Sequence, residues 1–165
     1  MVVMTTIVMR MSSPSKTPSS ATQLEARIFV SILKTADVLG QEAEQLLKSS
    51  NLTGAQYNVL RILRGAEPAG LPCRAIADEM ISHDPDITRL LDRMEKRGFI
   101  TRERQTDDRR VVKTRITPLG LGILKTLDQP VREAHKRQFG HMSAARLKLL
   151  AELLEEVRAR EPEQK

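Results

Sequence analysis

The chain of 165 residues has little of two residue types that stabilise many proteins: it contains one cysteine, no tryptophan and only 2% aromatic residues. A single cysteine excludes an intramolecular disulfide framework and suits a reducing compartment, so we expect a cytoplasmic protein. Leu, Ile, Val and Met must fill the core in place of large rings. Because 40% of the residues are hydrophobic, the chain can still bury one compact core.

The sequence also lacks the motifs of enzymes and of metal-binding proteins. It contains no Gly-rich phosphate loop, nucleophile elbow, HExxH or paired-cysteine zinc signature. His83, Asp84 and Asp86 are possible metal ligands, but the two aspartates are better explained by a helix start. His135 and His141 do not have the spacing of a ligand pair on a helix. We therefore expect neither an enzyme nor a bound cofactor or metal.

No apolar run reaches the ~20 residues that are needed to cross a bilayer. The opening MVVMTTIVMRM is apolar but lacks an early basic region, which argues against a signal peptide or anchor, and residues 12–20 (SSPSKTPSS) form a polar linker. We expect residues 1–20 to be a flexible tail, with Met9 or Met11 as an alternative start, and we expect no membrane partner.

Positive charge is concentrated in one segment. The whole chain has a formal charge of +6, and residues 97–115 hold seven basic and three acidic residues, a net of +4. Contacts of Lys and Arg with phosphates supply most non-specific affinity for DNA. A charge run is usually no more than a solvated surface, so it indicates DNA binding only in combination with the elements that precede it.

Two short helices precede the basic segment, and Pro72 opens the first. The second is predicted to begin at about Asp84, whose carboxylate can accept a hydrogen bond from a free N–H of the first turn. Pro85 suits the first helical position, and Asp86 suits the positive end of the helix dipole. Helical spacing then separates two sides, apolar Ile87, Leu90, Leu91 and Met94 from polar Thr88, Arg89, Asp92, Arg93 and Lys96.

A two-stranded ribbon is predicted to follow. Gly98 can take the left-handed conformation that ends a helix, and Thr117 with Pro118 can cap and open the helix after the ribbon. Helix, turn, helix and ribbon form a winged helix-turn-helix in a mainly α protein with a small β-ribbon wing. The ribbon consists of strands over residues 99–104 and 111–116 and a polar turn over residues 105–109.

These residues resemble the MarR-type regulators of bacteria and archaea. The resemblance lies in ITRLLDRMEKRGFITR (residues 87–102), in the D-x-R of the wing at Asp108 and Arg110, and in the I-T-x-x-G motif that ends at Gly120. It extends over roughly residues 24–158. The family implies a homodimeric winged-helix transcription factor, usually a repressor, that releases double-stranded DNA when a small-molecule effector binds.

The resemblance also implies roles for individual residues. Arg110 corresponds to the wing-tip arginine that enters the minor groove, with Asp108 positioning it. Between the two helices of the motif, where many members have Gly-Val, this chain has Ile81-Ser82. The residues expected to contact DNA are Asp84, Pro85, Asp86, Thr88, Arg89, Asp92 and Arg93 in the recognition helix and Arg104, Asp108, Arg109, Arg110 and Lys113 in the wing.

Amphipathic segments flank this lobe. Apolar residues in steps of three and four predict a long helix before it, and a capping box at Thr53 opens the next helix. After the wing, residues 119–139 are predicted to be helical with a kink or break at Pro130, and Ser143 caps a last helix. We assign residues 21–50 and 119–160 to dimerisation, 51–118 to the DNA-binding lobe and 161–165 to a tail.

The flanking helices are expected to pair two subunits, because the motif usually reads paired half-sites; the alternative is packing within one chain. Two recognition helices ~34 Å apart would meet consecutive major grooves of a pseudo-palindrome. A ligand lodged between the dimer helices and the lobe would act by changing that spacing. The residues expected at the dimer interface are Leu24, Ile28, Ile32, Leu147, Leu150, Leu154 and Val157.

Two other functions are compatible with the same elements. Cys73, beside Arg74 at a helix start, suggests redox sensing, although nothing here matches the reactive cysteine that peroxide-sensing members carry in the first long helix. A winged-helix module that acts through protein contacts would bind DNA little at any salt concentration, whereas a regulator loses affinity steeply with salt. For a regulator, the resemblance implies an apolar or aromatic effector, often an anionic phenolic compound.

Overall fold

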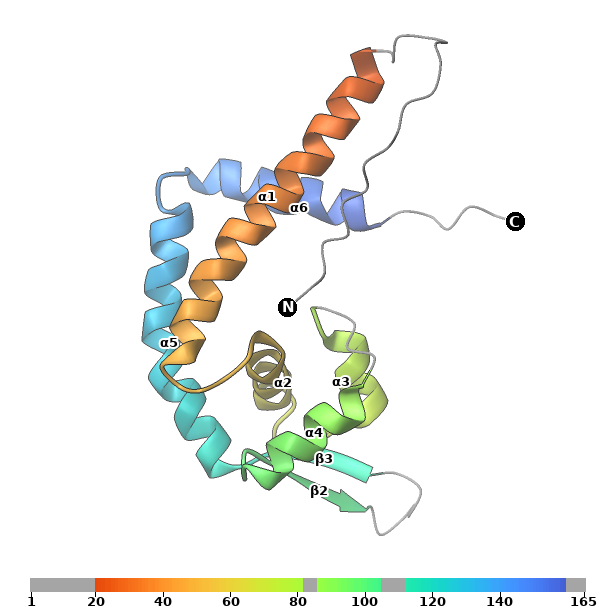
Figure 1. Cartoon of the computed structure of the whole chain (residues 1–165), viewed down its shortest axis with the longest axis vertical. Helices are drawn as coiled ribbons and strands as arrows, with labels where there is room; N and C mark the ends of the chain where they lie inside the picture. Colours follow the sequence, from red (N-terminus) through yellow and green to blue (C-terminus); the bar gives the residue numbers. More distant parts are fainter. Residues whose placement is uncertain (1–19, 82–85, 105–111, 160–165) are drawn as a thin grey trace, which may run out of the picture. The chain divides into compact units, whose positions relative to one another are not determined.

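The computed structural model describes residues 20–81, 86–104 and 112–159. These residues form six helices and a small sheet, which confirms the predicted mainly α architecture (Figure 1). None of the described helices is both long and apolar enough to cross a membrane. The elements in chain order are α1 (Ser20–Lys48), α2 (Gly54–Gly65), β1 (Leu71–Pro72), α3 (Cys73–Glu79), α4 (Ile87–Lys96), β2 (Ile100–Arg104), β3 (Val112–Ile116), α5 (Pro118–Phe139) and α6 (Ala144–Arg158).

The chain divides into two compact units, Met1–Asp37 and Val38–Lys165, with the boundary inside α1. The long helix predicted from the apolar periodicity is therefore present, but its first part belongs to a unit of its own. Over residues 21–37 every side chain is exposed except that of Ile32, which is half-buried. Leu24 is 54% exposed and Phe29 is 64% exposed. This stretch of α1 therefore presents apolar side chains that the chain itself does not bury.

The core of the second unit forms around α2. The predicted capping box is present: Thr53 Oγ1 accepts a hydrogen bond from Gln56 N at 3.2 Å, and Gln56 Oε1 accepts one from Thr53 N at 3.1 Å. From this fixed start, helical spacing directs Val59, Leu60 and Leu63 into the core. The other buried apolar side chains of this core cluster are Leu47, Leu52, Ile76, Leu90, Leu91, Met94, Phe99, Ile100, Ile116, Leu124 and Leu127.

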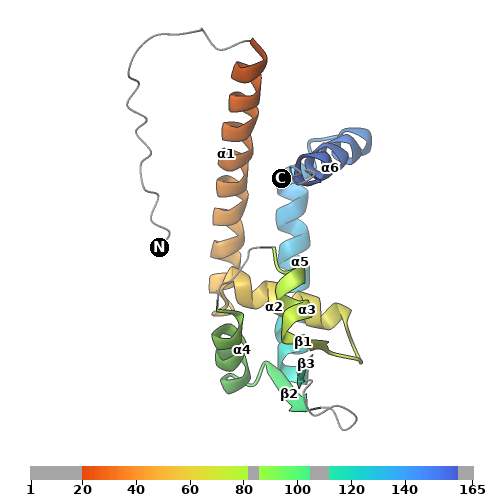
Figure 2. The same cartoon turned by 90° about the vertical axis from the view of Figure 1, so that its right-hand side faces the viewer.

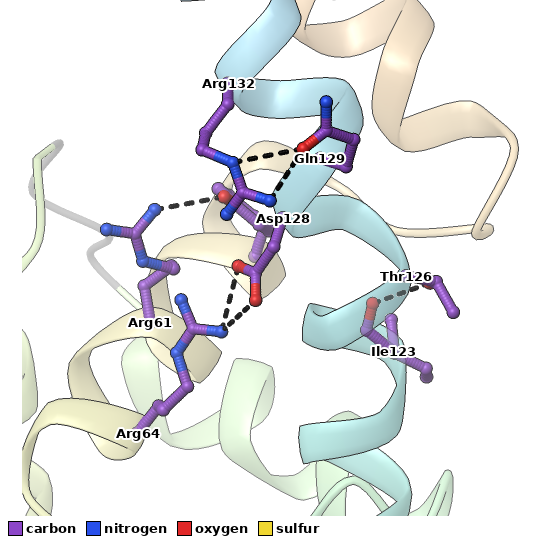
Figure 3. A network of polar contacts seen from close by, with 8 residues as sticks. Arg61, Arg64, Ile123, Thr126, Asp128, Gln129 and Arg132 are labelled. Atoms are coloured by element: carbon purple, nitrogen blue, oxygen red, sulfur yellow. Dashed lines mark hydrogen bonds and ion pairs between the residues drawn. The ribbon is translucent and has the colours of Figure 1, made fainter.

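An ion pair connects α2 to α5. Arg64 Nη1 donates to both carboxylate oxygens of Asp128 at 3.0 Å, and each side chain is about one-third exposed (Figure 3). A partly exposed pair of this kind contributes only ~1 kcal/mol or less, so apolar packing carries most of the stability. The pair adds a specific polar contact between α2 and α5 to that packing.

The wing is one strand larger than predicted. β3 pairs on one side with β2, with Arg102 opposite Thr114, and on the other side with β1, with Leu71 opposite Thr114. The predicted two-stranded ribbon is therefore a three-stranded sheet in the order β1-β3-β2. The sequence concealed β1 because it has only two residues and one of them is Pro72, which cannot donate a hydrogen bond to a ladder.

The start of α4 also differs from the prediction. The helix begins at Ile87, with Asp86 as its N-cap and not Asp84. The Asp86 carboxylate accepts a hydrogen bond from Arg89 N at 3.2 Å. Both aspartates have the chemistry of a cap, so composition alone could not choose between them. Asp84 and Pro85 lie outside the described residues.

The other helix ends follow the sequence more closely. Gly98, with φ +72°, ends α4 in the left-handed conformation, and Ser143 caps α6 through a hydrogen bond from Arg146 N. Of the predicted kink or break at Pro130, the break is wrong, because α5 continues from Pro118 to Phe139, whereas the kink stays a prediction. A proline removes only one helical hydrogen bond. Buried Leu127 and Ala134 hold the helix against the rest of the unit on both sides of it.

Gly120 lies at the point where several elements meet. The cap of α5 places it there, since Thr117 Oγ1 accepts from Gly120 N at 3.1 Å and also donates to the carbonyl of Gly98 at 2.7 Å. A Cβ at Gly120 would approach Phe99 O to 2.5 Å and Ile116 Cγ1 to 2.8 Å. The glycine of the I-T-x-x-G motif is therefore required by close packing.

We predict that Gly120→Ala lowers the free energy of unfolding by ~1–3 kcal/mol, because the added methyl group meets a backbone carbonyl that cannot move away. Gly122→Ala is the matched control in the same helix, where a Cβ meets nothing within 4 Å. It should raise stability by about 0.5–1 kcal/mol through the better helix propensity of alanine. Urea unfolding followed by circular dichroism at one protein concentration tests both, and equal effects would contradict the packing argument.

Candidate nucleic-acid interface

The interface begins with the amphipathic division of α4. Leu90, Leu91 and Met94 are buried in the core. Thr88, Arg89 and Arg93 lie on the opposite side and are exposed, and we call these three residues the recognition face. Both views place α4 beside the sheet, at the end of the second unit that is remote from α6 (Figure 2). The predicted DNA-contacting side of this helix is thus accessible to a large partner.

The first turn of α4 holds Arg89 close to the helix N-terminus. Arg89 Nε lies 3.1 Å from Asp86 Oδ2, and the Arg89 side chain is 79% exposed. Because the contact with Asp86 is made through Nε, it orients the guanidinium group of Arg89. Side chains near the start of an inserted helix are the ones that reach base edges in the major groove. Arg89 therefore occupies a suitable position for base contact.

A cluster of three charged residues joins the sheet to α4. Arg102 of β2 donates from Nη2 to Asp92 Oδ1 and to Glu95 Oε2, both at 2.6 Å, while Glu95 Oε1 accepts from the backbone N of Arg102 at 3.1 Å. The hydrogen bond that Arg102 donates to Glu95, and after it the one to Asp92, raises the pKa of the guanidinium above its ordinary value. Asp92, expected at the DNA surface, thus contacts the wing.

Two other basic residues of the positive segment also make internal contacts. Arg97 donates to Gln56 Oε1 at 3.2 Å and to the Asn51 carbonyl at 2.9 Å, and it stacks 4.4 Å from the ring centroid of Phe99. Arg115 donates to the carbonyl of Pro68. Of the five basic residues of this segment that the structure describes, three therefore make contacts within the lobe. Their charge is visible in the sequence, but these contacts include partners far away in the chain, which no local pattern indicates.

The remaining wing residues lie at the far end of the sheet. Arg104 ends β2 and is exposed, and Lys113 of β3 is half-buried opposite Glu103. Asp108, Arg109 and Arg110 lie outside the described residues. Exposed arginine side chains that can contact phosphates therefore lie on the recognition face and at the end of β2, where Arg104 is located.

Residues with sensing chemistry do not assemble into a site in the described part of the chain. Cys73 is a free, half-buried thiol at the first position of α3 and packs against the core. No group of three or more His, Cys, Asp or Glu side chains that could hold a metal occurs among residues 20–81, 86–104 and 112–159.

An apolar cavity of about 500 Å³ lies between the end of α1, α2 and α5. It is within the usual size of small-molecule sites, roughly 300–1,000 Å³. One wall residue, Ile81, follows α3 on the chain segment that leads to α4. The cavity is lined by Leu39, Gly40, Ala43, Leu46, Leu47, Tyr57, Ile81, Val131, Ala134, His135, Gln138 and Phe139.

The paired helices α3 and α4, the adjoining antiparallel sheet and the exposed basic recognition face together define a winged helix-turn-helix DNA-binding protein. A model described as the MarR family matches residues 52–112. The HTH-type transcriptional repressor IacR of Pseudomonas putida is 30% identical over 117 residues, which are 71% of this chain and 69% of that protein.

Solved structures give the same result. A MarR transcription factor from Planctomyces limnophilus is 37% identical, with 86% of this chain and 98% of that chain covered and a TM-score of 0.59. A mutant MarR from E. coli complexed with operator DNA is 24% identical, with 87% and 99% covered and a TM-score of 0.67. The chain belongs to the MarR family of transcriptional regulators.

The two kinds of arginine in the wing should respond differently to salt. Arg104→Gln should make the slope of log Kobs against log[salt] on duplex DNA less negative by about 0.9 for each phosphate that the variant no longer neutralises. Arg102→Gln is the matched control on the same strand. It should leave the slope unchanged, because its guanidinium already faces Asp92 and Glu95. Titrations at four or more salt concentrations measure both slopes; an equal change in the two variants would contradict this division of charge.

Proposed function

We propose that this protein is a homodimeric repressor that binds a pseudo-palindromic operator and is released by a small-molecule effector. The observation that carries the proposal is the recognition face, an exposed basic surface on a helix whose opposite side is fixed in the core. The E. coli MarR mutant of the same fold was solved with operator DNA, which supports the same use of α4 here.

The recognition face and the wing supply different parts of the binding energy. Arginine can donate two parallel hydrogen bonds to guanine in the major groove, a contact worth about 1–3 kcal/mol of discrimination. Arg89 and Arg93 are placed for that role, with Thr88 beside them. The ribbon end, with Arg104 and the wing-tip Arg110, contributes phosphate contacts and a minor-groove contact that fix the register on DNA.

Dimerisation follows from the apolar side chains that the chain leaves uncovered. In α6 no side chain is buried, and Leu149, Leu153 and Val157 are about half exposed. The α1 stretch that contains Leu24 and Ile28 is similarly exposed. Several exposed apolar side chains on one helix of a monomer are typical of an interface. A second copy of the chain is the partner that also supplies the second recognition helix.

The effector binds in the cavity between α1, α2 and α5 in this proposal. The cavity touches helices on the dimerisation side and the segment that leads to α4, so an occupant can favour one spacing of the recognition helices over another. The ligand need only bind the two arrangements with different affinity. BpsR of Bordetella bronchiseptica, of the same fold, is regulated in DNA binding by 6-hydroxynicotinic acid.

Operator selectivity tests the recognition face. Genomic fragments selected by the protein supply the operator, and affinity is then measured on that operator and on unrelated duplex DNA. Arg89→Ala should reduce the ratio of the two affinities by ~10-fold or more, because alanine cannot donate hydrogen bonds to a base. Lys96→Ala, a basic residue in the last turn of the same helix, should weaken both affinities alike or neither. An unchanged ratio in Arg89→Ala would remove Arg89 from base recognition.

The oligomeric state tests the second part of the proposal. Leu149→Glu combined with Leu153→Glu should give monomers, because both exposed side chains would place a carboxylate in the apolar interface. Lys148→Glu is the control, since it changes the net charge by the same −2 on a residue that is 82% exposed. Light scattering after size exclusion should show dimers for the wild type and the control. A dimeric double variant would refute an interface at α6.

A further inference from the structure

Among the described residues that line the cavity, none is Asp, Glu, Lys or Arg. Of these twelve residues, only Tyr57, His135 and Gln138 have polar side chains. A carboxylate or phosphate transferred into such surroundings loses its hydration without gaining a cation. The walls therefore favour a neutral occupant.

The polar groups at the edge of the cavity are already hydrogen-bonded. Gln138 Nε2 donates to Glu42 Oε2 at 2.8 Å, and Tyr57 Oη accepts from Arg61 Nη1 at 3.1 Å. Glu42 also accepts from Arg137 at 2.7 Å, and that hydrogen bond, ahead of the one from Gln138, lowers the pKa of Glu42. The Glu42 carboxylate is neutralised by its ion pair with Arg137, so it adds no net charge beside the cavity. One or two neutral hydrogen bonds, to His135 or to the Tyr57 hydroxyl, are what the site can still offer.

Ile81 is the wall residue that connects the cavity to the recognition helix. Its side chain is 91% exposed, although it is large and apolar. Its backbone N–H donates to Asn58 Oδ1 of α2 at 2.8 Å, so the main chain is held at this point while the side chain is left uncovered. Ile81 lies five positions before Asp86, the N-cap of α4. An occupant that covers Ile81 would therefore contact the chain five positions before that N-cap.

We propose that this cavity takes an uncharged, largely apolar molecule with at most one or two hydrogen-bonding groups, and that Ile81 transmits its occupancy to α4. Both the ligand class and the role of Ile81 rest on the proposed function as an effector-controlled DNA-binding protein. It replaces the expected anionic phenolic effector with a neutral one. The ligand class is set by the lack of a cation among the described wall residues, and the route to DNA is set by one residue shared by the cavity and the segment leading to α4.

A pair of probes that differ only in charge tests the ligand class. 2-Naphthalenemethanol and 2-naphthoate share the ring and nearly the same size, and calorimetry on the full chain measures both affinities. The alcohol should bind at least ~10-fold more tightly, a difference of about 1.4 kcal/mol. Equal or tighter binding of the carboxylate would overturn the proposal, as would failure of both probes to bind.

Two phenylalanine substitutions on α1 locate the site. Ala43 lines the cavity and is exposed, so Ala43→Phe can fill the space without disturbing the core. It should abolish binding of 2-naphthalenemethanol. Glu44→Phe is the matched control, because Glu44 is the adjacent exposed residue and is not part of the lining. Its probe affinity should match that of the wild type. Unchanged binding in Ala43→Phe would assign the probe to another place.

The role of Ile81 is tested by the ratio of operator affinity without and with 2-naphthalenemethanol. In the wild type this ratio should lie at about 5–150, the usual range of coupling between two sites. Ile81→Ala should bring the ratio close to 1 while the probe still binds. A full ratio in Ile81→Ala would overturn the transmission route. Failure of the proposed function is distinguishable, because it appears as absent operator binding in wild-type protein without any probe.

Discussion

The close approach at Gly120 is the constraint on which the rest of the structure depends. There the first turn of α5 meets the carbonyl of Phe99, the side chain of Ile116 and Leu60 of α2 with no room for a Cβ. The contact fixes where β2 and β3 leave the core, and it sets the direction in which α5 departs towards α6. The wing and the helix that leads to the proposed dimer interface therefore share one closely packed junction, since close-packed interiors transmit displacement instead of absorbing it.

The distribution of arginines shows how one residue type serves two purposes. Arg97 and Arg102 use planar, multiply donating guanidinium groups to hold the end of α4 and the start of the wing in fixed positions. Arg89 and Arg93 present the same group to solvent on the recognition face. The internal set is surrounded by acceptors such as Glu95, whereas the external set leaves donors available. Fixed geometry from the first makes selective contact by the second possible.

The cavity lies between elements of the second unit to which different functions are proposed, dimerisation and DNA binding. Its walls come from the end of α1, from α2 and from α5, and Ile81 brings in the segment before α4. In the proposed function, the uncharged walls disfavour a charged occupant. The family resemblance alone suggested an anionic effector, so the side chains of this chain and the family expectation point to different chemistry.

Elements with local signals can be predicted from the amino-acid sequence: the capping box at Thr53, the glycine stop at Gly98, the cap at Thr117 and the amphipathic pattern of α4. These depend on residues within a few positions of one another. Four other features depend on contacts in the folded chain: which aspartate caps α4, the addition of β1 to the sheet, the continuation of α5 through Pro130, and the binding of Arg102 to two carboxylates instead of to DNA. The same holds for the cavity and for Ile81 in its wall, because contacts between residues distant in the chain are set by packing, which no local pattern encodes.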